Sequence, residues 1–173
     1  ATALKWHTCA WLLLPVLVFL AGWMYWYAAL PLMLLTAAGL APRKCKEPQT
    51  RDSLPAFPLF TRSSFLALAA FAALMTLSGW GEWVNQHPDH IVRNACLREL
   101  VASPWPVIFP DGNMLVYNTG FWLVPALAGK LAGLDAARVL VVLWGTWGLF
   151  LAWLWLCVFS GRRSLLLALL MAA

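Results

Sequence analysis

The chain has 173 residues, of which 62% are hydrophobic and only 11% are charged, and its formal net charge at pH 7 is +5. Its mean hydropathy of +0.75 lies outside the usual range of soluble domains. The basic residues are scattered in short segments between apolar runs instead of forming one stripe, which argues against nucleic acid as a partner. We therefore predict an all-α, polytopic integral membrane protein whose positive charges report its topology.

The first apolar run, residues 8–41, is too long for one ordinary membrane span and short for two. We expect a hairpin that turns in the aromatic stretch of residues 22–27, because Lys5 before it and Arg43-Lys44 after it would then share the cytoplasmic side. One long, tilted helix that is kinked at its prolines is the alternative. A cleaved signal peptide is less favoured, since no small-residue cleavage pattern precedes a polar chain.

The segment 42–63 holds the strongest positive cluster, so the positive-inside rule predicts that it is cytoplasmic. With the hairpin before it, this segment forms a first unit, residues 1–63. Residues 64–80 then run outward as a short span, and residues 138–160 return inward to a pair of arginines. Residues 164–173 begin another helix that is too short to cross a bilayer. We therefore expect the N-terminal fragment of a larger helical bundle.

Between the two spans lies a long segment, residues 81–137, which this topology places on the external side. Asp89, directly after Pro88, is expected to be the N-cap of an interfacial helix. Residues 121–138 look like a further span, but a crossing there would leave Arg162-Arg163 outside. A re-entrant or interfacial helix satisfies the charges better.

The order of these segments resembles the N-terminal part of GT-C fold glycosyltransferases. Two stretches carry the resemblance: Asp89 followed by "HIVRNACLREL", and the run that starts at "LVYNTGFW" and ends with "GRRSLLLALLMAA". It covers residues 64–173, which we take as a second unit. The resemblance implies transfer of a sugar from a polyprenyl-phosphate carrier to an acceptor on the external face. It also implies a place in the bacterial inner (plasma) membrane.

On this resemblance, an external carboxylate takes a proton from the acceptor hydroxyl, with Asp89 as the first choice for this base and Glu82 as the second. Arg93 and Arg98 would pair with the carrier phosphate, and Asn94 lies beside them as a third substrate-binding residue. The sequence leaves an alternative open, in which Asp89 only caps the helix and pairs with Arg93 one turn later.

Two histidines flank Asp89 and are the candidate metal ligands. His87 and His90 would hold a divalent metal cation that offsets charge on the leaving phosphate. The favoured role for both is a solvated loop histidine, so no cofactor is required by the sequence.

Two other classes of protein stay open. A transporter or channel subunit normally has charged groups within its spans, and these spans are almost free of charge. A structural or assembly subunit of a membrane complex needs no chemical site, and its polar loop would contact other membrane subunits.

Overall fold

A computed structural model describes residues 2–40, 61–84, 86–161 and 171 of the chain. The described residues form six helices: α1 (Thr2–Trp23), α2 (Trp26–Leu40), α3 (Arg62–Leu77), α4 (Pro88–Ala102), α5 (Gly120–Ala132) and α6 (Leu134–Ser160). Within these residues the β pairing is one isolated antiparallel bridge, between Ile108 and Met114. The all-α expectation is confirmed.

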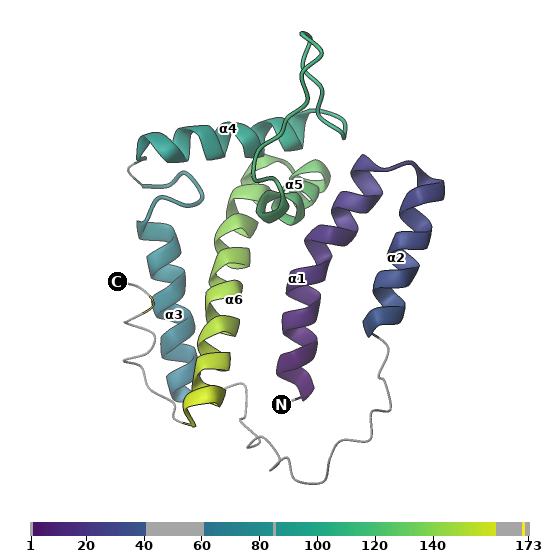
Figure 1. Ribbon diagram of the computed structural model, residues 1–173. Helices are drawn as coiled ribbons and strands as arrows, with labels where there is room; N and C mark the ends of the chain where they lie inside the picture. The colour runs from purple at the N-terminus through teal and green to yellow at the C-terminus, as the bar shows by residue number, and fades with distance from the viewer. Residues whose placement is uncertain (1, 41–60, 85, 162–170, 172–173) are drawn as a thin grey trace.

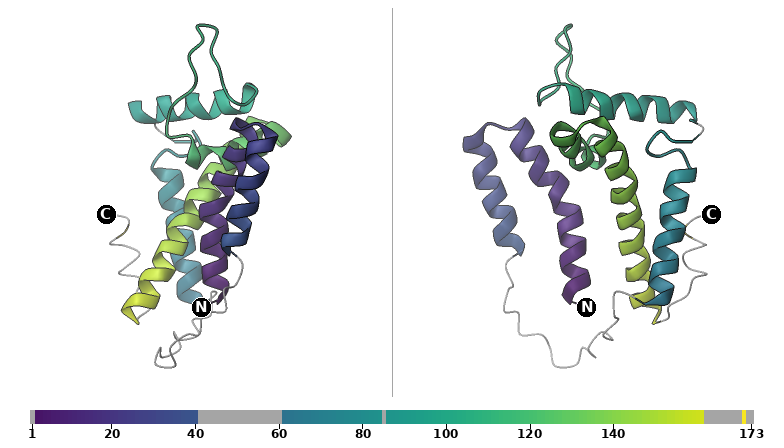
Figure 2. Two further views of the ribbon diagram at one scale, coloured as in Figure 1. Left: turned by 45° about the vertical axis from the view of Figure 1, so that its right-hand side comes forward. Right: turned by 180° about the vertical axis from the view of Figure 1, so that it is seen from behind.

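The helices form a bundle that is closed at one end. Figure 1 shows α1, α3 and α6 running along a common direction, with α4 and α5 lying across the end where α3 finishes and α6 begins. The views in Figure 2 show the same arrangement from the side and from behind. We call this end of the bundle the capped end. Beyond α4 a loop formed by residues 103–119 projects away from the helices.

The N-terminal run is a helical hairpin, as expected. α1 ends at Trp23 and α2 begins at Trp26, so the break falls inside the aromatic stretch, and the two helices lie antiparallel (Figure 1). Gly22 lies against the projecting loop, because a Cβ built on it would come within 2.6 Å of the Trp105 ring. Residue 41 and the segment after it lie outside the described residues.

The two predicted spans are helices with slightly different limits. The run predicted as residues 64–80 is α3, which begins at Arg62 after the N-cap Thr61, whose Oγ1 accepts from the Ser64 amide at 3.3 Å. The span predicted from residue 138 begins earlier, at Leu134, because Gly133 with φ +90° turns the chain directly from α5 into α6. α5 has 13 residues and lies across the bundle (Figure 1), and its expected interfacial or re-entrant place in a membrane stays a prediction.

Two helices are long and apolar enough to cross a membrane, namely Ala3–Trp23 and Leu134–Ser160. α2, α3 and α5 are shorter apolar helices. The start of α1, the end of α2, the start of α3 and the end of α6 lie at the end of the bundle opposite the capped end (Figure 1). Arg43-Lys44 and Arg162-Arg163, on which the expected orientation depends, lie outside the described residues, so the orientation stays a prediction.

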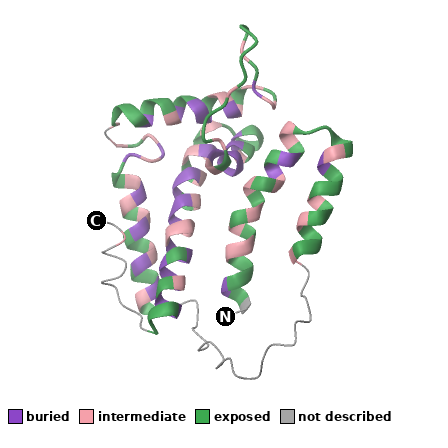
Figure 3. Cartoon of the chain, in the orientation of Figure 1, coloured by how far each residue is buried: buried purple, intermediate pink, exposed green. Residues whose placement is uncertain are grey.

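Burial is concentrated on α5, α6 and the inner face of α3 (Figure 3). α1 and α2 instead expose most of their apolar surface, with side chains such as Leu12, Leu34 and Leu35 between 56% and 68% exposed. α1 is nevertheless joined to α6, because Trp11 Nε1 donates to the Trp144 carbonyl at 3.1 Å. The division into units 1–63 and 64–173 stays a prediction.

Candidate functional site

The first turn of α4 differs from the expectation. His87 is the N-cap, and its Nδ1 accepts from the Asp89 amide at 3.4 Å. The prediction that Asp89 caps this helix is wrong, because Pro88, which has a fixed φ and no N–H, occupies the first helical position and moves the cap back to His87. Asp89 lies in the first turn, where the helix dipole favours a carboxylate, and its side chain is 71% exposed.

The expected pair between Asp89 and Arg93 is not formed. The Asp89 carboxylate lies 3.7 Å from His87 Nδ1, whereas the Arg93 guanidinium lies over the Trp80 ring, 5.5 Å from its centroid. Among the residues that the structure describes, no carboxylate is within ion-pair distance of Arg93. Arg93 is therefore a half-buried cation that is oriented by an aromatic ring and not neutralised by the chain.

Asn94 and His90 are buried and have internal partners. Asn94 Nδ2 donates to Gln86 Oε1 at 2.7 Å, and Gln86 in turn donates to the Gly79 and Val84 carbonyls. The His90 ring packs edge-on against Trp80, with 5.8 Å between the ring centroids. Asn94 thus fixes the loop before α4, and His90 supports the ring beneath Arg93.

The candidate metal ligands His87 and His90 do not form a complete metal site among the described residues. In the described ranges, no three His, Cys, Asp or Glu side chains come together at a spacing that would hold a metal ion. His87 Nδ1 accepts the capping hydrogen bond, and His90 is enclosed by aromatic packing. The structure therefore brings neither histidine into a metal-binding set of three.

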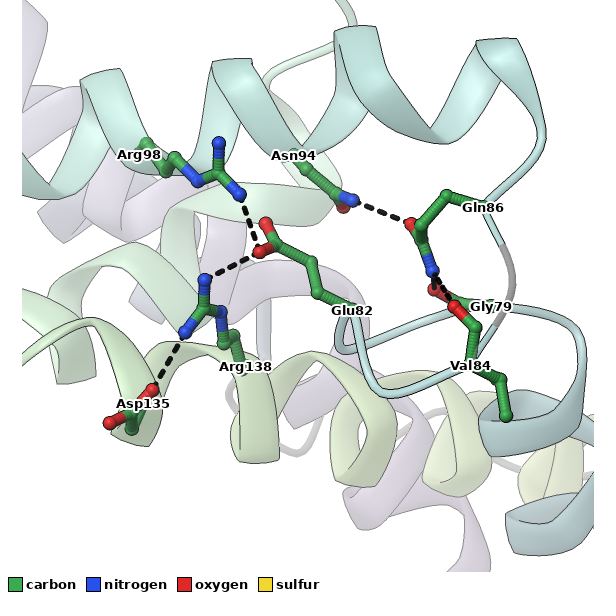
Figure 4. Close-up of polar contacts among 8 residues, drawn as sticks. All are labelled: Gly79, Glu82, Val84, Gln86, Asn94, Arg98, Asp135 and Arg138. Atoms are coloured by element: carbon green, nitrogen blue, oxygen red, sulfur yellow. Dashed lines mark hydrogen bonds and ion pairs between the residues drawn. The ribbon is translucent and has the colours of Figure 1, made fainter.

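Glu82 lies at the centre of an ion cluster that joins three elements (Figure 4). Its Oε2 accepts from Arg98 Nη2 of α4 at 2.6 Å and from Arg138 Nη2 of α6 at 2.5 Å. Arg138 also donates to Asp135 at 2.8 Å. The Glu82 side chain is only 10% exposed, and its backbone has φ +68°. Both partners of Oε2 are guanidinium groups that join separate helices, so the geometry of this carboxylate suits a structural clamp rather than a base.

A groove opens beside Arg93 and continues between the helices. It encloses about 590 Å³. Its polar mouth is formed by Arg93, Tyr117 and Asn118, and its walls are apolar or small side chains: Trp11, Met75, Trp80, Phe121, Trp122, Gly145, Gly148, Leu149 and Ala152. Two other hollows, of about 640 Å³ and 390 Å³, are lined without any charged residue.

Small residues on α6 let neighbouring helices pack closely along this groove. Gly145, Gly148 and Ala152 follow the spacing of one helix face, which in the rest of α6 is filled by bulky side chains. A Cβ on Gly145 would collide with the Met75 methyl group, and one on Gly148 would lie 2.5 Å from the Trp11 ring. The glycines therefore let α3 and α1 approach α6 closely at this level.

Sequence reasoning found Arg93 but missed the remaining groove residues. The aromatic walls come from α1, α5 and the loop before α4, which are far apart in the sequence. The spacing of Gly145, Gly148 and Ala152 is the one signal that was readable in advance. Arg98, expected beside Arg93 as a phosphate ligand, is engaged by Glu82.

No protein-family model, curated protein or solved structure matches this chain. The resemblance to GT-C enzymes therefore stays a prediction, and the function has to be argued from the groove and its mouth.

Proposed function

We propose that the chain is the N-terminal part of an integral membrane glycosyltransferase of the GT-C type, which binds a polyprenyl-phosphate-linked sugar in the groove beside Arg93. The observation that carries the proposal is the combination of a long apolar groove with one unneutralised cation at its polar mouth. A lipid phosphate has the complementary shape and charge, with one anionic head and one apolar tail.

The surface of the N-terminal hairpin supports a membrane setting. α1 is long enough to cross a bilayer, and α1 and α2 expose large apolar side chains such as Leu30 and Leu35, at 54% and 68%. A soluble monomer rarely exposes such a continuous apolar surface. In this setting the capped end lies at the headgroup level, where Trp80 and Trp105 suit the boundary between lipid and water.

Arg93 is the residue that we assign to the phosphate. A guanidinium binds phosphate through paired, charge-assisted hydrogen bonds, and here the Trp80 ring already restricts its orientation. Asn118 and Tyr117 add hydrogen-bonding groups at the same mouth. Arg98 and Arg138 are less suited, because both are bound to Glu82.

Asp89 is the carboxylate that we assign to proton transfer. It lies one turn before Arg93 on α4, is 71% exposed and has no arginine partner among the described residues. In the proposed reaction the acceptor hydroxyl gives its proton to Asp89, its oxygen bonds to the anomeric carbon, and the phosphate leaves on the lipid carrier.

Binding of undecaprenyl phosphate to the purified protein in lipid nanodiscs tests the phosphate assignment. Arg93→Gln removes the charge but keeps a polar side chain, and we expect affinity to fall about 10-fold to 100-fold, the usual value of a charge-assisted hydrogen bond. Lys5→Gln is the matched control, because Lys5 is an exposed cation at the opposite end of the bundle. Unchanged affinity in Arg93→Gln would remove Arg93 from the site.

A further inference from the structure

Arg138 uses only part of the guanidinium edge that it turns toward Glu82 (Figure 4). On a guanidinium, the Nε and Nη2 N–H groups lie side by side, and they pair with the two oxygens of a carboxylate that faces them. Here Arg138 Nη2 donates to Glu82 Oε2 at 2.5 Å, but Arg138 Nε and Glu82 Oε1 are buried without a hydrogen-bond partner among the described residues. These two atoms are therefore the missing half of one side-on pair.

Arg98 competes with this side-on pair. Its Nη2 donates to the same Glu82 oxygen, Oε2, at 2.6 Å, so one oxygen accepts from both arginines. A carboxylate that turned both oxygens toward Arg138 would lose the contact with Arg98 and gain one with Arg138 Nε. The number of hydrogen bonds would stay the same, and the buried atoms would be paired. Arg98, which is 54% exposed, would be solvated by water, so the exchange costs little free energy.

The backbone keeps the Glu82 carboxylate between the two arginines. Gly81 and Glu82 have φ of +86° and +68°, and a residue with a side chain rarely adopts this conformation. On the other side of the contact, Leu97 and Leu100 hold α4 in the core of the capped end, at 2% and 0% exposure. The exchange therefore needs a rotation of the Glu82 side chain and no movement of a helix.

We propose that Glu82 is a two-position latch that releases Arg98 to an oxyanion from outside the chain. When the phosphate, sulfate or carboxylate group of a ligand pairs with Arg98, the Glu82 carboxylate turns and pairs side-on with Arg138. No proton moves, because each guanidinium stays charged and only hydrogen bonds are exchanged. Arg98 then becomes a second anion-binding cation on α4. The latch does not rest on the proposed function, because it involves neither the groove nor Arg93.

Hydrogen exchange of the Arg138 Nε–H tests the latch, followed by NMR on protein with isotope-labelled arginine in phosphatidylcholine nanodiscs. The signal is identified by its absence from Arg138→Lys. Arg98→Gln removes the competing guanidinium, so Glu82 should pair side-on with Arg138 and slow this exchange about tenfold or more, the value of one charge-assisted hydrogen bond. Arg98→Lys, which keeps a cation beside Glu82, is the matched control and should stay close to wild type. Equal exchange in Arg98→Gln and wild type would overturn the latch.

Loss of the Arg98 charge also changes the local potential, which by itself alters base-catalysed exchange. The substitution is therefore repeated in a Glu82→Ala background, where residue 82 can pair with neither arginine. The latch predicts that Arg98→Gln slows exchange only when Glu82 is present. Equal slowing in both backgrounds would assign the effect to charge alone and contradict the latch.

Oxyanions test the release of Arg98 directly in the wild-type protein. Inorganic phosphate, added at constant ionic strength, should slow Arg138 Nε–H exchange toward the Arg98→Gln value. Nanodiscs that contain phosphatidylglycerol show whether a lipid headgroup is an equally good source of the oxyanion. Arg93→Gln should keep the response and Arg98→Gln should lack it. The proposal fails if neither source slows exchange, if Arg98→Gln responds equally, or if the response is lost in Arg93→Gln.

Discussion

At the scale of single residues, the cations of the capped end have different tasks. Arg98 and Arg138 share Glu82, and Lys130 donates to the Ser103 carbonyl just after α4 and lies 5.1 Å from the Trp105 ring centroid. These contacts bind one element to another. Arg93 is the exception, because its described contact is with an aromatic face and its charge is left for an anion from outside the chain.

The two carboxylates near α4 should respond differently to removal of their charge. Asp89→Asn is expected to lower sugar transfer from a polyprenyl-phosphate carrier by about 100-fold to 10,000-fold, because the general base is lost, while the exposed position keeps stability nearly unchanged. Glu82→Gln is expected to lower the free energy of unfolding by about 1 to 3 kcal/mol, because Arg138, at 24% exposure, loses its closest anion.

Transfer assays and thermal unfolding, run on the same preparations of both variants, distinguish these effects. Full activity in Asp89→Asn would remove that residue from the mechanism. A stable but inactive Glu82→Gln protein would move the base to Glu82. A well-folded wild-type protein without activity on any lipid-linked sugar would favour a structural or assembly subunit, or part of a transporter.

At the scale of elements, the corner between α5 and α6 positions the groove. Gly133 turns the chain with φ +90°, and Gly129 lies where α4, α5 and α6 meet. A Cβ on Gly129 would lie 2.5 Å from Val101 and 2.8 Å from the Ala137 Cβ. The absence of a side chain at Gly129 therefore allows α5 to lie across the bundle at close range.

Gly129→Ala should destabilise this corner. Overpacking of a tight contact costs about 1 to 3 kcal/mol, which outweighs the better helix propensity of alanine. Gly120→Ala, at the start of the same helix with nothing within 4 Å of the added Cβ, is the control and should be neutral or slightly stabilising. Thermal unfolding in one detergent measures both. If Gly129→Ala has the same melting temperature as Gly120→Ala, then α4 and α6 shift freely to make room for the added methyl group.

The helices were largely predictable from sequence, whereas the site was not. Apolar runs and basic ends indicated the hairpin, α3 and α6, because hydrophobic length is a local property. The Glu82–Arg138 contact joins residues 56 positions apart, and nothing local marks such a pair. The prediction of Asp89 as the cap was wrong for a local reason, since Pro88, and not the residue after Asp89, occupies the first helical position.

At the scale of the whole molecule, the ends of the helices sort into two groups. The projecting loop, α4 and α5 lie at the capped end, while Lys5 and Arg62 lie at the opposite end (Figure 1). If the basic end is cytoplasmic, the groove mouth at Arg93 faces the external headgroup layer. The proposed reaction then takes place on the external side of the membrane.

Cysteine labelling in intact cells tests this orientation. Val116 is 87% exposed on the projecting loop, so Val116→Cys in a protein without other cysteines should react with an impermeant maleimide. A protein that keeps only Cys45, in the predicted cytoplasmic segment, should react only after the cells are permeabilised. Labelling of Cys45 in intact cells, together with protection of Val116→Cys, would reverse the predicted membrane orientation. The groove mouth would then lie on the cytoplasmic side.

The native Cys96 is unsuitable as the external reporter, although it lies on α4. It is 4% exposed, and burial raises its pKa to about 11. Because the thiolate is the reactive form, a raised pKa keeps Cys96 protonated at neutral pH and slows its labelling on either side of the membrane. A protein that keeps Cys96 alone should therefore stay unlabelled at pH 7 even after permeabilisation, and react only when denatured. Rapid labelling of native Cys96 at pH 7 would contradict the packing of α4 against α5.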